Sequence, residues 1–85
     1  MASSERRTHL DVIASILDAC QYWTKKTHVM FQCNMSYKQL TDYLDMLLKA
    51  NLLIIENDRQ SPLLRVSSKG EDFLKAYNSI KTMME

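Results

Sequence analysis

The polar residues at the start of one helix are the part of this sequence best suited to recognition chemistry. The run that begins at Ser36 predicts a capped amphipathic helix, and its first turns carry the side chains of Ser36, Tyr37, Lys38, Gln39 and Thr41. Side chains of these types can contact base edges and phosphates, and a helix amino terminus itself favours a phosphate oxygen. The turn is therefore a candidate DNA contact. An ordinary solvated helix start with the same cap explains these residue types too.

Cations lie on both sides of this turn. Lys25 and Lys26 begin the preceding helical segment, where positive charge opposes the helix dipole, and Arg59 falls at the tip of a predicted hairpin. All three could hold phosphates. Asp42 and Asp45, on the predicted recognition helix itself, would repel phosphates if they were turned toward DNA. For that reason, any affinity for DNA is expected to be modest.

Catalytic and metal-binding patterns are poor. His9 and His28 have no nucleophile partner at motif spacing, and the single glycine, Gly70, excludes a glycine-rich phosphate loop. Cys20 and Cys33 form no CxxC pair and are interpreted as small core residues. We expect no enzymatic activity, no metal, no cofactor and no small-molecule substrate.

Composition limits the chain to one small domain. It has 85 residues, 11 Lys and Arg against 10 Asp and Glu, and a net charge of +1. Its core is expected to be marginal, so oligomerisation is the expected supplement. We expect a single domain over residues 1–85 with residues 1–7 disordered. We also expect no membrane span and no signal peptide, and the free cysteines favour a cytoplasmic location.

The first two expected helices precede the candidate contact. Apolar residues at helical spacing predict an amphipathic first helix that fades near Gln21 and is capped by Thr8 with Asp11. Its core stripe is Leu10, Ile13, Leu17 and Cys20. Tyr22 and Trp23 are interpreted as packing residues rather than as a platform for base stacking. A short second helix is expected to be capped by Thr24 and to end at Asn34.

The remaining elements are a helix, a hairpin and another helix. Ser36 and Gln39 predict a capping box, and Asn51 ends that helix. Apolar runs at residues 52–56 and 63–66 predict a short hairpin, with Pro62 at an edge or at a strand start. The last helix is expected over residues 67–85, and its outer stripe predicts dimerisation through Tyr77, Ile80, Met83 and Met84.

These elements predict an α+β, mostly α, winged helix-turn-helix: three helices, a short β-hairpin wing and a C-terminal helix. The runs KKTHVMF (25–31), NMSYKQL (34–40), YLDMLL (43–48) and SSKGEDFLKAY (67–77) resemble the archaeal winged-helix DNA-binding family, in its small dimeric ten-kilodalton type with a C-terminal dimerisation helix. The resemblance covers roughly residues 8–80. Met35 stands where the family has leucine, and Asn51 where it has glycine.

The resemblance implies a homodimer that binds double-stranded DNA in transcription or chromatin, in an archaeal or archaeal-virus cytoplasm, associated with the nucleoid. The leading hypothesis is a transcriptional regulator. Two alternatives remain: an architectural chromatin protein without sequence preference, and a winged-helix module that binds another protein. The near-neutral charge is the best support for the last alternative.

Overall fold

The computed structural model describes residues 8–57 and 61–85, so the expected disorder of residues 1–7 and the role assigned to Arg59 lie outside the described residues. The described residues form four helices and three strands. In chain order they are α1 (His9–Ala19), β1 (Thr24–Lys25), α2 (Lys26–Gln32), α3 (Tyr37–Lys49), β2 (Leu53–Asn57), β3 (Pro62–Val66) and α4 (Ser68–Met83).

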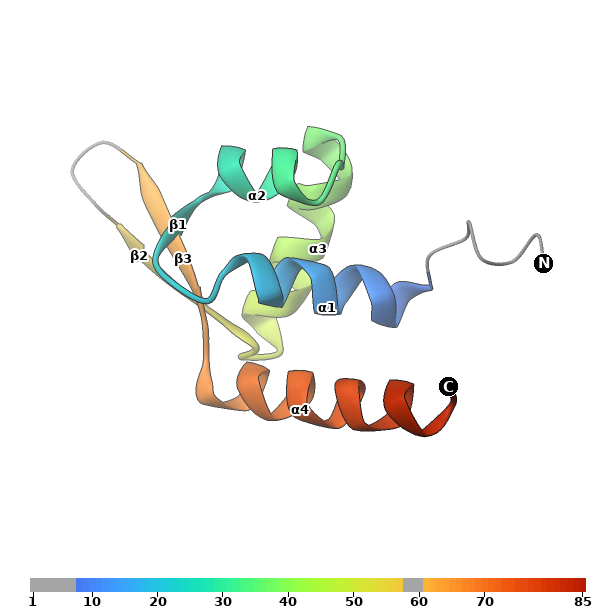
Figure 1. The fold of residues 1–85 in the computed structure, drawn as a ribbon. Coiled ribbons are helices and arrows are strands. Elements are labelled where there is room, and N and C mark those ends of the chain that lie inside the picture. The colour runs from blue at the N-terminus through green and yellow to red at the C-terminus, as the bar shows by residue number, and fades with distance from the viewer. Residues whose placement is uncertain (1–7, 58–60) are drawn as a thin grey trace.

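The helices form a layer beside a small twisted hairpin (Figure 1). In that view α1 crosses in front of α3, α2 lies above α1, and α4 runs below α1. The strands β2 and β3 project to the left as the wing. The sheet is antiparallel with the order β1-β3-β2, and the register pairs Leu53 with Val66 and Ile55 with Leu64. This arrangement confirms the winged-helix prediction, with Pro62 at the start of its strand.

Strand β1 was not expected. The sequence predicted that Thr24 caps the second helix, but Thr24 and Lys25 extend beside Leu64 and Leu63 of β3. The helix begins one residue later, and its cap position, Lys25, makes no side-chain cap hydrogen bond. A two-residue strand has too few positions for an alternating pattern, so only its tertiary pairing reveals it.

Local signals set the ends of the longer helices. Thr8 with Asp11 and Ser36 with Gln39 both form reciprocal capping boxes, as predicted. Asn34 and Asn51 adopt left-handed φ angles of 54° and 63°, so each ends a helix as expected. Beyond Asn51, the Leu52 amide donates to the Leu47 carbonyl at 2.9 Å, which closes the end of α3.

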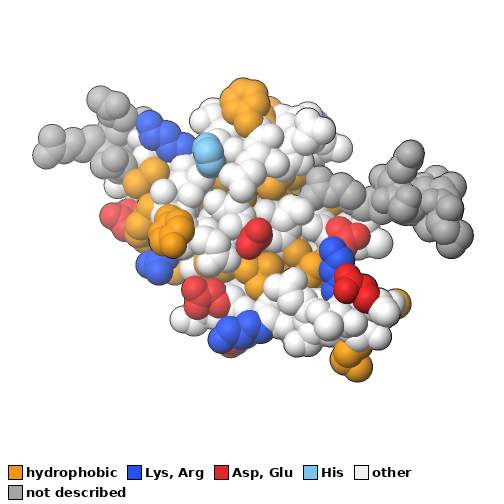
Figure 2. Space-filling view, in the orientation of Figure 1, with side chains coloured by type: hydrophobic (Ala, Val, Ile, Leu, Met, Phe, Trp, Pro, Cys, Tyr) orange, Lys and Arg blue, Asp and Glu red, His pale blue; other side chains and the backbone are white. Residues whose placement is uncertain are grey.

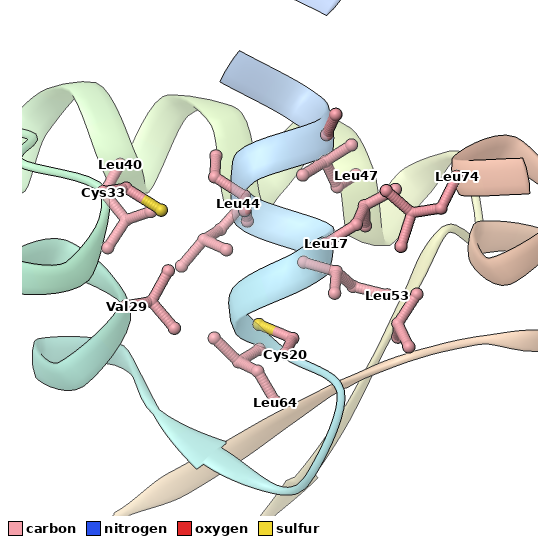
Figure 3. Packing of buried hydrophobic residues seen from close by; sticks show 13 residues of the cluster. Leu17, Cys20, Val29, Cys33, Leu40, Leu44, Leu47, Leu53, Leu64 and Leu74 are labelled. Atoms are coloured by element: carbon pink, nitrogen blue, oxygen red, sulfur yellow. The ribbon is translucent and has the colours of Figure 1, made fainter. Parts of the chain in front are cut away.

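One apolar core joins all the layers (Figure 3). Ile16, Leu17 and Cys20 of the first helix meet leucines of α3 and the inner face of the hairpin. The buried residues are Ala14, Ile16, Leu17, Cys20, Val29, Cys33, Leu40, Leu44, Leu47, Leu53, Leu64, Val66 and Leu74. The predicted α1 stripe was wrong at one position: Leu10 is 54% exposed and lines a groove beside α4, whereas Ile13, one turn later, packs against the core.

A polar junction fixes α4 against the end of α3. The Ser67 hydroxyl donates to the Asn51 carbonyl at 2.6 Å, and the Lys69 ammonium donates to the Ala50 carbonyl at 2.9 Å. Both bonds satisfy carbonyls that the end of a helix leaves without partners. Gly70 is required here, since a Cβ on it would lie 2.3 Å from the Leu52 carbonyl oxygen. The junction therefore sets the angle between α3 and the last helix.

Candidate nucleic-acid interface

The first turn of α3 presents the polar residues that the sequence singled out, but three of them are held by local bonds. The Ser36 amide donates to Gln39 Oε1 at 3.2 Å, and the Gln39 amide donates back to Ser36 Oγ at 3.2 Å. The Thr41 hydroxyl donates to the Tyr37 carbonyl at 2.8 Å. Tyr37 is 63% exposed and the Lys38 side chain 88% exposed, and neither takes part in the cap.

Two of the predicted contact residues meet across elements. The Lys26 ammonium lies 4.2 Å from the centre of the Tyr37 ring, a cation–π distance that joins the start of α2 to the start of α3. Lys26 and Thr41 also line a cleft of about 220 Å³ between α3 and the sheet, together with Ile55 and Pro62 of the wing. The cleft therefore brings the candidate helix, its preceding lysine and the base of the wing to one place.

Adjacent lysines face different hollows. Lys25 lines a second, open hollow of about 500 Å³ with Trp23 and Phe31, on the other side of the β1–α2 connection from the cleft. The interpretation of Tyr22 as a packing residue was wrong, because Tyr22 is 81% exposed; Trp23 is mostly covered but keeps 39% of its surface exposed. The chain leaves the core at the end of α1 and has to cross its surface to reach β3, which turns both rings outward.

The carboxylates on α3 are paired with lysines of the same helix. Lys38 lies 3.6 Å from Asp42, and Lys49 lies 3.2 Å from Asp45, in both cases between the side-chain nitrogen and a carboxylate oxygen. Exposed pairs of this i,i+4 type contribute only about 0.3–0.5 kcal/mol each, so Lys38 can leave Asp42 for a phosphate at small expense. While the two pairs stay formed, the lysines partly cancel the repulsion expected from Asp42 and Asp45.

The most informative charge pattern is a stretch without carboxylates. Residues 19–41 contain no Asp or Glu, while they contain Lys25, Lys26 and Lys38. This stretch covers β1, α2 and the first turn of α3, and it supplies the whole lining of the open hollow. It supplies only Lys26 and Thr41 to the cleft, whose lining also includes the Asp45 carboxylate. Net charges summed over longer segments hid this stretch, because Asp11 and Asp18 offset the charges of its lysines in those sums. Scanning for runs that lack one sign of charge would have found it.

The described residues include no candidate metal centre, and the thiol of Cys20 is not activated. Among them, no three His, Cys, Asp or Glu side chains are grouped as metal ligands would be. Burial, and after it the neighbouring Cys33, raises the pKa of the Cys20 thiol to about 12, so this thiol stays protonated at neutral pH. None of the described helices has the length and apolar character needed to cross a membrane.

The residues assigned to dimerisation lie on a separate surface. The outer half of α4 and the start of α1 form an apolar groove of about 430 Å³ that includes Leu10, Tyr77, Ile80 and Met84. Met83 and Met84 are each 83% exposed. Tyr77 is half-buried, and its hydroxyl donates to Asp11, so its polar end is used within the protomer. Leu10 is a member of this surface that sequence reasoning assigned to the core.

Comparisons with known proteins agree with this architecture. A family model described as winged helix-turn-helix matches residues 6–85. The DNA-binding protein Sso10a-2 of Sulfolobus solfataricus has a similar structure, with a TM-score of 0.84, 20% identity and coverage of 92% of this chain and 82% of that one. None of the curated protein sequences matches the chain.

Two bacterial regulators share the fold over about half of their length. The transcriptional regulator PcaV of Streptomyces coelicolor gives a TM-score of 0.71 at 18% identity, covering 84% of this chain and 52% of that one. A mutant of Staphylococcus aureus MepR bound to an oligodeoxyribonucleotide gives 0.74 at 14% identity, covering 88% and 56%. At these identities the likeness is one of fold.

Proposed function

Since this chain belongs to the winged helix-turn-helix family, we propose that it binds double-stranded DNA as a homodimer and acts as a transcriptional regulator. The observation that supports the proposal is the carboxylate-free stretch of residues 19–41, in which Lys26 and Lys38 lie at the exposed start of α3 and Lys25 lies beside the open hollow. In helix-turn-helix proteins the second helix of the pair enters the major groove and the first crosses the backbone. Here α3 and α2 would take those two places.

The roles of individual side chains follow from their settings. Tyr37 and Lys38 extend from the first turn of α3 and would contact the groove, while Lys25 and Lys26 would contact phosphates. Ser36 and Gln39 hold the amino terminus of α3 in its capped form, which fixes the position of that turn. The outer residues of α4, Ile80, Met83 and Met84, would join two copies and so place two α3 helices on one DNA molecule.

A salt titration of duplex binding tests the proposal. Affinity for a duplex should fall steeply with salt concentration, and the slope should decrease by about one in Lys26→Ala, because one phosphate contact releases about one counterion. Lys75→Ala is the matched control, since Lys75 is an exposed lysine on α4 outside the stretch. Absence of duplex binding at low salt, or an equal change of slope in both variants, would contradict the proposal.

One observation favours an architectural role over sequence-specific regulation. A glutamine reads adenine through both its amide oxygen and its NH₂ group, but the oxygen of Gln39 is already engaged in the helix cap. Reading adenine would require that cap to open. Competition between unrelated duplexes of equal length decides between the two roles. A regulator prefers one sequence at least about a thousandfold, and an architectural protein binds all of them alike.

A further inference from the structure

Two aromatic side chains on and just before α2, Trp23 and Phe31, are exposed. Phe31 is 77% exposed on α2, and Trp23 is 39% exposed just before β1. Both rings line the open hollow of about 500 Å³ on the outer side of the β1–α2 connection. The opposite face of α2 supplies Val29 and Cys33 to the core, so the orientation of the helix fixes Phe31 on the outside.

The backbone that carries Trp23 is held on both sides. The Thr24 hydroxyl donates to the Tyr22 carbonyl at 2.6 Å, and Thr24 pairs with Leu64 in the sheet. Before this turn, the Val66 amide donates to the Cys20 carbonyl at 2.8 Å. A ligand that entered the hollow would therefore meet a backbone already fixed in place, which lowers the entropy lost on binding.

The charge around the hollow suits a polyanion. Its lining consists of Trp23, Thr24, Lys25, Thr27, His28 and Phe31, and none of these six side chains is a carboxylate. Figure 2 shows no Asp or Glu side chain over α2 on the visible face, whereas several appear lower down, toward α4. An acidic partner with flat apolar groups would match both the rings and the charge.

We propose that this hollow, the Trp23–Phe31 site, binds single-stranded nucleic acid, with an unpaired base stacked on the rings and a backbone phosphate on Lys25. Stacking on aromatic side chains beside a cation is how proteins hold single strands without regard to sequence. In a duplex the faces of the bases are covered by their neighbours, so this site and the α3 surface take different forms of nucleic acid. The site shares Lys25 with the proposed duplex surface, but its rings lie outside that surface, so substitutions of Phe31 test it separately.

The protein carries its own reporter for this site. Trp23 is the only tryptophan in the chain, so quenching of its fluorescence by oligodeoxythymidylate of about eight nucleotides measures occupancy directly. We expect saturable quenching by the single strand. A blunt duplex whose strands have mixed sequence should quench Trp23 at least about tenfold less effectively at equal nucleotide concentration.

Two substitutions of Phe31 separate stacking from simple apolar contact. Phe31→Leu keeps an apolar side chain but removes the ring, and we expect it to raise the Kd for the oligonucleotide about tenfold or more. Phe31→Tyr keeps the ring and should bind like the wild type. Circular dichroism melting should show all three forms equally folded, because the ring is mostly exposed.

Absence of quenching in the wild type would overturn the proposal. Equal affinity of Phe31 and Phe31→Leu would overturn it too, and would point to an apolar protein partner that needs no ring. Duplex binding measured on the same variants keeps the two functions apart. If Phe31→Leu loses single-strand binding and keeps duplex binding, the ring acts in the hollow. If it keeps single-strand binding and loses duplex binding, the proposal is contradicted.

Discussion

Two exposed apolar surfaces among the described residues differ in their charge. The Trp23–Phe31 site has its rings beside Lys25 and lies in the carboxylate-free stretch. The groove between α1 and α4 mixes aliphatic and thioether side chains with the rings of Phe73 and Tyr77, and it carries both a carboxylate, Asp11, and an ammonium, Lys81. The first composition suits a nucleic acid, and the second suits a second copy of the chain. Exposure alone would not have distinguished them.

The two surfaces are fixed to each other through the α3–α4 junction. Gly70→Ala should have the largest effect on this arrangement, because the added methyl group would lie 2.3 Å from the Leu52 carbonyl oxygen and 2.6 Å from Val66 Cγ2. We expect a loss of about 3 kcal/mol in the free energy of unfolding, the upper end for overpacking. Urea titration followed by circular dichroism measures it. The exposed neighbour Ser68→Ala is the control, and an unchanged midpoint for Gly70→Ala would show that the junction yields.

A carboxylate in the α1–α4 groove should separate the two surfaces by function. Ile80→Glu is expected to raise the dimer dissociation constant about thirtyfold, or about 2 kcal/mol, since Ile80 lies in the middle of the exposed stripe. Gln32→Glu adds the same charge at an exposed position of α2, away from α4, and should leave the dimer intact. Sedimentation equilibrium measures both. A monomeric wild type, or equal dissociation of the two variants, contradicts the assignment of this groove.

The smallest effect concerns the polar edge of that groove. The Tyr77 hydroxyl, followed by the amide and hydroxyl of Thr8, lowers the pKa of Asp11 below its ordinary value of 3.8. A lowered pKa stabilises the fold above the unfolded value, and the stabilisation is lost as the pH falls through the folded value. Tyr77→Phe should therefore lower the melting temperature slightly near neutral pH, and the difference should shrink below pH 3.8. A difference independent of pH would place the role of the hydroxyl elsewhere.

Signals within a few residues predicted most of the fold. The capping residues Thr8 and Ser36 and the left-handed Asn34 and Asn51 depend on local hydrogen bonds and φ angles, so the sequence reveals them directly. Strand β1 depends on a partner 40 residues away, Thr24 with Leu64, and no local pattern announces it. Tertiary pairing therefore decided the one element that sequence reasoning missed.

The candidate site was predictable in its residue types but not in its partners. Sequence reasoning found Lys26 and Tyr37 separately, while their contact at 4.2 Å depends on the angle between α2 and α3. It assigned Leu10 to the core and Tyr22 to packing, because helical periodicity says which residues share a face and not what covers that face. Where a helix projects beyond its neighbours, as α1 and α4 do, an apolar face becomes a surface.

Amide chemical-shift mapping with a DNA duplex shows directly whether the carboxylate-free stretch binds DNA, since it reports every described element in one experiment. We predict that, at low salt, shifts concentrate at residues 24–26 and 36–41, and that residues 75–85 of the α4 end stay unchanged. The carboxylate-free stretch would then be the duplex-binding surface and the α4 groove a separate one. Shifts centred on α4, or no shifts at a duplex concentration well above that of the protein, would contradict the account.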